Sequence, residues 1–303
     1  MPQIKANGIS FEYDEIGPSD GDPVLLVMGF GAQMTFWPDS FRQPLADAGY
    51  RVIRFDNRDI GLSHQFDDKG IPNIAGVMAK ATAGEDASDL VPYKLDDMVA
   101  DTAAVIEALD IKPAHIVGAS MGGMIAQLLT LDYPGHVRSL TAMMTTSGDP
   151  SLPPAKPEAM AALTAQPESP ARDDVIATGV TARKTIGSHP DVRDPDDMIR
   201  DKVATGFDRA YRPFGVMRQY GAILAQTHWY ERLGDIAKPT LVVHGVEDPL
   251  LPVTSGRDVA NRIEGAEIAE VEKWGHDLPE AVTPELARIV SQFLERMKIS
   301  ATS

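Results

Sequence analysis

The sequence contains no cysteine, no excess of basic residues and no long hydrophobic run. Without cysteine the chain can form neither a disulfide framework nor a thiolate nucleophile. Its 28 lysines and arginines stand against 44 aspartates and glutamates, which gives a formal net charge of −16. Phosphate backbones attract clustered cations, so we expect no nucleic-acid partner. The same charge favours neutral or cationic substrates over anionic ones.

The lack of a membrane-length apolar run predicts a chain that does not cross a membrane. Residues 1–7 also lack the basic stretch and apolar region of a secretory leader, so we expect a cytoplasmic protein. Apolar residues make up 43% of the chain and charged residues 24%, as in globular proteins that bury a sizeable core. A length of 303 residues fits one large domain or two modest ones.

Short apolar runs alternate with helix-like stretches through much of the chain. Residues 2–16 alternate loosely and indicate a pair of edge strands. Further strands are expected at 23–28, 50–55, 114–117, 137–145, 240–244 and 267–271, and helices at 40–48, 95–109, 124–129 and 284–297. Strands that are apolar on both faces and separated by helices predict a mostly parallel sheet. In such sheets, active sites gather at the carboxyl ends of the strands.

The strand rhythm stops between residues 148 and 237. Six prolines punctuate residues 150–170, and helical patterns follow at 173–186, 195–211 and 214–224. We interpret the segment as a helical cap inserted into the sheet domain; a long surface excursion without a role in binding would be unusual at this length. The predicted organisation is a first core part at 1–147, a cap at 148–237 and a second core part at 238–303.

The segment Gly118-Ala119-Ser120-Met121-Gly122 lies where an apolar strand-like run meets a helix-like run. This pattern is typical of a nucleophile elbow. Glycines at both ends allow a sharp turn without Cβ clashes, and the turn exposes the serine hydroxyl in front of a helix N-terminus. We therefore predict Ser120 as a catalytic nucleophile.

A nucleophilic serine needs a histidine base and a carboxylate that orients it, and in this topology they follow the serine in the order acid, then histidine. Of the seven histidines, His276 is predicted as the base because it comes just after the strand at 267–271. Asp248 follows the preceding strand and is the predicted acid. Asp149, which follows another strand, is kept as the alternative acid, whereas Asp277 is discounted because most turns would point it elsewhere.

A second group of expected site residues lies in the loop 28–33, after the first long apolar strand. The backbone N–H groups of Phe30 and Met121 are the predicted oxyanion hole. Gly29 allows the loop to approach the serine closely. The side chains expected to form apolar pocket walls are Phe30, Trp37, Met121 and Met144, although each of them could equally belong to the core.

The stretch Asp56-Asn57-Arg58-Asp59-Ile60-Gly61-Leu62-Ser63 carries charges that could suggest a metal site. One arginine and two aspartates in a tight turn are more simply explained as an internally paired loop near the pocket rim. Histidines and carboxylates elsewhere in the chain lack convincing ligand spacing, so we expect no metal.

The chain resembles the capped serine hydrolases of the α/β-hydrolase superfamily. The resemblance rests on four motifs in order: Met28-Gly29-Phe30-Gly31, the elbow at 118–123, the Asp248 turn and Trp274-Gly275-His276. Met28-Gly29 replaces the His-Gly of many members and looks like the anthracycline methylesterase branch. The resemblance implies an α/β fold with eight strands, a helical lid between the sixth and seventh strands, and no cofactor. It matches the predicted roles of Ser120, Asp248, His276, Phe30 and Met121.

These features predict a carboxylic-ester hydrolase that acts on a small-molecule ester through an acyl-enzyme intermediate. A serine at the elbow excludes the dehalogenases and epoxide hydrolases of this fold, which use a carboxylate nucleophile. The same triad could instead act on another bond, as in carbon–carbon hydrolases, amidases and cofactor-free perhydrolases. A ligand-binding, receptor-like member with vestigial catalysis is a third reading. The sequence leaves the physiological substrate, the stereoselectivity and the oligomeric state open.

Overall fold

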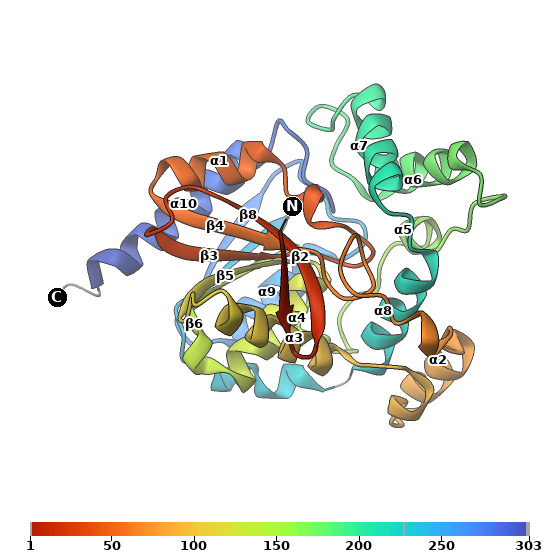
Figure 1. Ribbon diagram of the computed structural model, residues 1–303, viewed down its shortest axis with the longest axis horizontal. Helices are drawn as coiled ribbons and strands as arrows, with labels where there is room; N and C mark the ends of the chain where they lie inside the picture. Colours follow the sequence, from red (N-terminus) through yellow and green to blue (C-terminus); the bar gives the residue numbers. More distant parts are fainter. Residues whose placement is uncertain (1, 227, 301–303) are drawn as a thin grey trace.

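The computed structural model describes residues 2–226 and 228–300, and its centre is an eight-stranded sheet (Figure 1). The strand order is β1-β2-β4-β3-β5-β6-β7-β8, and pairing is parallel from β4 to β8 and antiparallel at β1 and β2. The expected mostly parallel sheet of eight strands is confirmed. The strands are β1 Gln3–Ala6, β2 Ile9–Ile16, β3 Asp22–Val27, β4 Tyr50–Phe55, β5 Ala114–Ala119, β6 Val137–Met143, β7 Thr240–Gly245 and β8 Glu267–Val271.

Helices cover both faces of the sheet and form a separate group beyond one edge (Figure 1). The α-helices are α1 Asp39–Asp47, α2 Ile74–Thr82, α3 Leu95–Ala108, α4 Met121–Asp132, α5 Pro157–Leu163, α6 Arg172–Ile186, α7 Asp196–Arg209, α8 Pro213–Ala225, α9 Val253–Arg262 and α10 Thr283–Ser300. The 3₁₀ helices are η1 Met34–Phe36, η2 Asp67–Lys69, η3 Ser88–Leu90, η4 Pro134–His136 and η5 Trp229–Asp235.

The hydrophobic core has two layers, one on each face of the sheet. On one face, α1 and α10 pack over the strands with Phe41, Leu45 and Phe293 fully or almost fully buried. On the other face, α3, α4 and α9 pack with buried side chains such as Ile106 and Ile125. Apolar strands between two helix layers explain why β3, β5 and β7 are apolar along nearly their whole length. Because the strands from β4 to β8 are parallel, their carboxyl ends lie together along one edge of the sheet.

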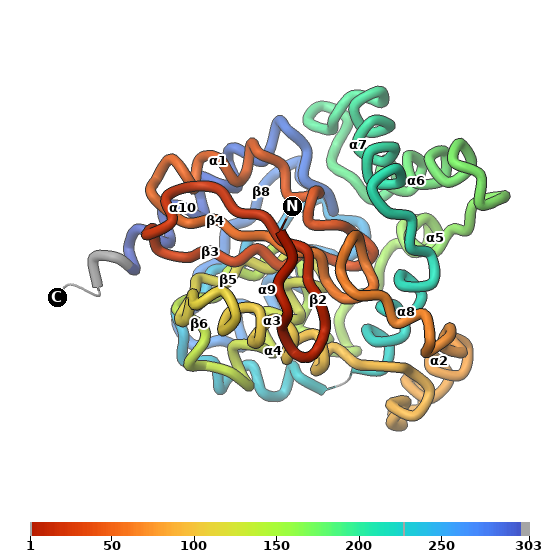
Figure 2. The backbone as a smooth tube through the Cα atoms, viewed as in Figure 1, coloured from red at the N-terminus to blue at the C-terminus, as the bar shows by residue number. Residues whose placement is uncertain are grey.

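Between β6 and β7 the chain forms the helices α5, α6, α7 and α8, which lie over this edge (Figure 1). We call these four helices the cap. The tube view shows α2, which follows β4, beside α8 (Figure 2). Val77 of α2 is buried against Ala225 of α8. The cap layer therefore includes a helix that the sequence patterns did not predict, from far outside residues 148–237.

In the part of the chain that the structure describes, no helix is both long enough and apolar enough to cross a membrane.

Candidate active site

Ser120 occupies the sharp turn between β5 and α4. Its backbone has φ +55° and ψ −121°, a conformation that side-chain-bearing residues rarely adopt. The neighbouring glycines make the turn possible: a Cβ on Gly122 would lie 2.0 Å from the Val27 carbonyl oxygen, and one on Gly118 would lie 2.1 Å from the Gly122 oxygen. Gly118 and Gly122 thus allow a strained turn that places the serine hydroxyl beyond the end of β5.

The structure brings Ser120, His276 and Asp248 into one hydrogen-bonded chain. His276 Nε2 lies 2.9 Å from Ser120 Oγ, and His276 Nδ1 lies 2.7 Å from Asp248 Oδ2. A carboxylate can only accept, so Nδ1 carries the proton and Nε2 is free to accept from the serine hydroxyl. These residues follow β5, β8 and β7, whose carboxyl ends meet at the same sheet edge. The arrangement can perform serine nucleophilic chemistry.

The Asp248 carboxylate is held by the backbone of its own turn. Its Oδ1 accepts hydrogen bonds from the N–H groups of Leu250 at 2.9 Å and Leu251 at 2.8 Å. Oδ2 is thereby left to face His276. The turn therefore orients the acid as well as placing it at the strand end.

His244, at the end of β7, lies directly behind this acid. Its Nε2 is 2.8 Å from the Leu251 carbonyl oxygen and 3.7 Å from Asp248 Oδ2. Burial lowers the pKa of His244, despite the nearby carboxylate. The ring is therefore neutral at neutral pH, with its proton on Nε2 and donated to the carbonyl.

The loop that carries His276 is attached to the end of the cap helix α6. The His276 backbone N–H donates to the Ile186 carbonyl oxygen at 2.9 Å, and the Gly275 N–H donates to Ser188 Oγ at 3.0 Å. Asp277 Oδ1 accepts from both the hydroxyl and the N–H of Ser188, at 2.5 and 3.1 Å. Asp277 thus points into the cap, and burial raises the pKa of its carboxyl group.

The alternative acid, Asp149, has other partners in the structure. Its carboxylate accepts from the Ser151 N–H at 2.8 Å and forms an ion pair with Arg262. The hydrogen bonds from Ser151, followed by the charge of Arg262, lower the pKa of Asp149. The carboxylate in contact with the His276 ring is that of Asp248.

The loop after β3 passes directly over the serine. A Cβ on Gly29 would lie 3.0 Å from Ser120 Cβ and 3.5 Å from Ser120 Oγ, so only glycine fits here without a shift. Within residues 2–226 and 228–300, the turn and loop hydrogen bonds engage neither the Phe30 nor the Met121 backbone N–H. Both groups are therefore available as donors, which is what an oxyanion hole requires.

Two residues that the sequence analysis did not single out hold this loop. Asn57 Nδ2 donates to the Met28 carbonyl oxygen at 2.9 Å. Gln219 Oε1, from the cap helix α8, accepts from the Gly31 N–H at 3.0 Å. The loop is thus fixed from the core side and from the cap side.

Two of the expected pocket walls, Trp37 and Met144, lie in the core. Trp37 is fully buried, and its ring is 5.0 Å from that of Phe41 between centroids. Met144 is 5% exposed and belongs to the same core layer. Neither side chain lines the cavity described next. Their contact with substrate stays a prediction.

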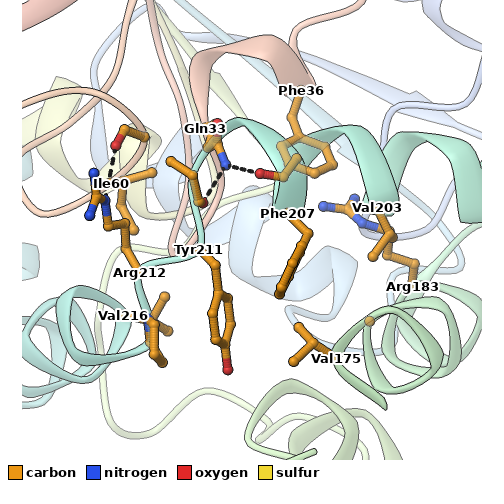
Figure 3. A pocket seen from close by; sticks show the side chains of 16 residues that line it. Gln33, Phe36, Ile60, Val175, Arg183, Val203, Phe207, Tyr211, Arg212 and Val216 are labelled. Atoms are coloured by element: carbon orange, nitrogen blue, oxygen red, sulfur yellow. Dashed lines mark hydrogen bonds between the residues drawn. The ribbon is translucent and has the colours of Figure 1, made fainter. Parts of the chain in front are cut away.

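A cavity of about 210 Å³ opens between the cap and the core loops (Figure 3). It starts at Gly31, next to the expected oxyanion donor, and extends between α6, α7 and α8. Most of the lining is apolar or aromatic; the side chains drawn include Phe36, Val175, Val203, Phe207, Tyr211 and Val216, together with Gln33, Ile60, Arg183 and Arg212. The space is suited to the apolar body of a small molecule.

The sequence suggested that the charged side chains of the loop at 56–63 pair with one another. The structure shows that they do not. The charged side chains of this loop instead reach other elements: Asp56 pairs with Arg209 of α7 at 2.7 Å, Asp59 with Arg218 of α8 at 2.7 Å, and Arg58 with Asp101 of α3 at 2.5 Å. Two of the three pairs thus anchor the cap. Across the described residues, no group of histidines and carboxylates is arranged to hold a metal ion.

Comparison with known proteins gives this geometry a context. A family model described as the alpha/beta hydrolase fold matches residues 22–280. The rhodomycin D methylesterase of Streptomyces sp. (strain C5) is 30% identical over 95% of this chain and 95% of that protein. The rhodomycin D methylesterase of Streptomyces peucetius is 28% identical over 90% of each. The enol-lactonase from Burkholderia xenovorans LB400 superposes with a TM-score of 0.72 at 19% identity, covering 98% of this chain and all of the other, and shares the fold.

Proposed function

This chain belongs to the alpha/beta hydrolase family, and from that premise we propose that it is a serine esterase that cleaves small to medium carboxylic esters through an acyl-enzyme intermediate. The observation that carries the proposal is the hydrogen-bonded chain from Asp248 through His276 to Ser120 at a strained elbow. Relatives named as methylesterases support ester hydrolysis and a small leaving alcohol such as methanol.

In the first half of the reaction, Ser120 Oγ attacks the ester carbonyl carbon while His276 Nε2 takes the hydroxyl proton. The N–H groups of Phe30 and Met121 stabilise the negative charge that develops on the carbonyl oxygen. Asp248 keeps the imidazole in the required tautomer and stabilises its transient positive charge. The tetrahedral intermediate collapses when His276 gives the proton to the departing alkoxide, which leaves as the alcohol.

In the second half, water attacks the acyl-Ser120 ester while His276 Nε2 takes a proton from it. Collapse of the second intermediate returns that proton to Ser120 Oγ and releases the carboxylic acid. The cap covers the carboxyl ends of the parallel strands and leaves a largely apolar cavity beside the oxyanion loop. An apolar acyl or alcohol group is the substrate part that such a cavity would accept.

The test is hydrolysis of p-nitrophenyl esters from acetate to decanoate, and of the corresponding methyl esters, by the wild type and Ser120→Ala. We expect the variant to lose activity by about 10⁴-fold or more at unchanged folding. Ser151→Ala, the same change at an exposed serine of a nearby loop, is the control and should retain wild-type rates. A fluorophosphonate should add to the intact mass of the wild type but not to that of Ser120→Ala.

Equal ester hydrolysis by wild type and Ser120→Ala would remove the serine from the mechanism. Serine-dependent labelling with only trace hydrolysis of every ester would instead direct the search to carbon–carbon, amide or peracid chemistry by the same triad.

A further inference from the structure

Arg183, near the end of the cap helix α6, lines the cavity beside the oxyanion loop (Figure 3). Its guanidinium carbon lies 3.8 Å from the centre of the Phe36 ring. Among the residues that the structure describes, the guanidinium forms neither a hydrogen bond nor an ion pair. Burial lowers the pKa of Arg183 to about 10, so the group is still charged at neutral pH. The cavity therefore contains one cation whose N–H groups have no partner in the described chain.

Two carboxylates, Asp277 and Asp194, act on Arg183 through their charge, and each also accepts hydrogen bonds from other groups. Asp277 accepts two hydrogen bonds from Ser188. Asp194 accepts from Lys202 Nζ at 2.7 Å and from the Glu280 N–H at 2.9 Å. Arg183 is partly exposed and lines the cavity, so a ligand in the cavity can reach its side chain. Both carboxylates thus favour the charged form of Arg183, but neither accepts a hydrogen bond from its N–H groups.

The stacking on Phe36 determines which part of the guanidinium a ligand can reach. The Phe36 ring lies against the guanidinium carbon, whereas the N–H bonds radiate outward in the plane of the group. A carboxylate can accept two parallel hydrogen bonds from such an edge. Most of the rest of the lining, including Phe207 and Val203, is apolar or aromatic. The other polar side chains of the lining, Gln33 and Arg212, already donate hydrogen bonds to backbone carbonyl oxygens. The cavity therefore suits a molecule with an apolar body and one carboxylate.

Two residues of the cavity lining are close along the chain to groups of the expected reaction centre. Gly31, in its lining, directly follows Phe30, the expected oxyanion donor. Arg183 lies one helical turn before Ile186, whose carbonyl oxygen accepts from the His276 backbone N–H. The lining thus includes one residue of the oxyanion loop and one residue of the helix that holds the histidine loop, whereas Ser120 and His276 themselves are not among the lining residues.

We propose that Arg183 binds a carboxylate of the substrate, and that the preferred substrates are half-esters with an apolar body, one ester group and one free carboxylate. This inference rests on the proposed esterase function. The net charge of −16 works against anionic ligands at long range. A guanidinium in a partly enclosed cavity acts at contact distance, where solvent screens it much less.

The test compares the monomethyl and dimethyl esters of adipate, suberate and sebacate as substrates for the wild type and Arg183→Gln. We expect the wild type to prefer the half-ester of the best-fitting chain length in kcat/KM. Arg183→Gln should lower kcat/KM for that half-ester by about 10- to 100-fold, mainly through KM, and change the value for the diester by less than about two-fold. Arg183→Lys should restore part of the preference.

Arg200→Gln is the matched control, because it removes an exposed arginine from the neighbouring helix α7 by the same substitution. It should keep the wild-type preference. Binding of free suberate, measured by calorimetry on the wild type and Arg183→Gln, provides a readout that does not need catalysis. Binding to the wild type that is lost in Arg183→Gln supports the site.

The outcomes separate this inference from the proposed function. If the wild type cleaves both esters with equal kcat/KM and Arg183→Gln does the same, the carboxylate site is refuted and the esterase stands. If the wild type cleaves no ester but binds suberate through Arg183, the site stands and the esterase does not. If it neither cleaves nor binds, both are refuted.

Discussion

The side-chain oxygen of Gln219 accepts a 3.0 Å hydrogen bond from the backbone N–H of Gly31, and thereby joins the cap helix α8 to the loop of the expected oxyanion hole. Gln219 is fully buried, and its amide nitrogen donates to the Arg58 carbonyl oxygen at 2.9 Å. One side chain therefore bridges two core loops from the cap. Phe30, whose N–H is an expected oxyanion donor, directly precedes Gly31, so the bridge supports the loop next to that donor.

Replacing Gln219 by leucine should lower kcat by about 10-fold, because the oxyanion loop loses its support on the cap side and a displaced donor stabilises less charge. It should also lower the free energy of unfolding by about 1–3 kcal/mol, since two buried backbone groups lose their partner. Gln166→Leu, the same change at an exposed glutamine before α6, is the control. Steady-state kinetics well below the unfolding midpoint, together with urea denaturation, measure both effects. An unchanged kcat in a destabilised Gln219→Leu would make the bridge purely structural.

The three candidate acids can be ranked by single isosteric substitutions. Asp248→Asn should reduce kcat by about 10⁴-fold, because an amide favours the wrong imidazole tautomer and cannot stabilise the imidazolium. Asp149→Asn and Asp277→Asn should stay within a few-fold of the wild type, since these carboxylates contact Ser151 and Ser188 rather than the histidine. Ester hydrolysis at one pH, with circular dichroism as the folding control, decides the ranking. A large loss of kcat in Asp149→Asn alone would assign the role of acid to Asp149 instead of Asp248.

Sequence patterns predicted most of the core and the three residues that meet in the site. The strands β4 and β8 lie where their apolar runs predicted them. The turns that carry Asp248 and His276 follow strand ends in the structure, as the sequence predicted. These features depend on local chemistry: apolar runs, glycines at a strained turn, and polar residues directly after strands. Such signals are complete within a few residues of chain.

Features that depend on distant packing could not be predicted in this way. The helix α2 has only one fully buried residue, Val77, so its sequence carries a weak amphipathic signal. Gln33 and Gln219 read as ordinary polar residues, although their partners lie more than 150 residues away in the chain. The internal pairing predicted for residues 56–63 was wrong because the competing partners come from the cap and from α3.

The buried ion pair between Arg218 and Asp59 should be a main anchor of the cap. Two hydrogen bonds of 2.7 and 2.8 Å join them, both side chains are at most 1% exposed, and the Tyr93 hydroxyl donates to the same carboxylate at 2.7 Å. Arg218→Met leaves that carboxylate buried without its cation, which should cost about 3–5 kcal/mol in the free energy of unfolding.

The double variant Arg218→Met with Asp59→Asn should recover a large part of this loss, because no uncompensated charge remains. Arg172→Met, which breaks an exposed pair with Asp208, is the control and should change stability by less than about 1 kcal/mol. Chemical denaturation of the wild type, the single variants Arg218→Met and Asp59→Asn, and the double variant measures the coupling. If the loss of stability in the double variant equals the sum of the losses in the two single variants, Arg218 and Asp59 are not energetically coupled.

Stability at mildly acid pH should depend on His244. Burial lowers its pKa in the folded protein, whereas the unfolded chain has the ordinary value near 6.5. Below that value the unfolded state binds a proton that the folded state refuses, so the free energy of unfolding falls as the pH falls. The contribution of this one group reaches at most about 1.4 kcal/mol per pH unit, and it ends once the folded pKa is passed.

His244→Gln removes the titrating group but can still donate from its amide to the Leu251 carbonyl oxygen, which His244 Nε2 faces at 2.8 Å. The unfolding free energy of the variant should therefore decline less steeply than that of the wild type between about pH 7 and pH 5. His228→Gln, at an exposed histidine, should follow the wild-type slope. Urea denaturation across this pH range gives the slopes, so any constant loss from altered packing cancels. Parallel curves for the wild type and His244→Gln would mean that the folded protein accepts the proton on His244 as readily as the unfolded chain does.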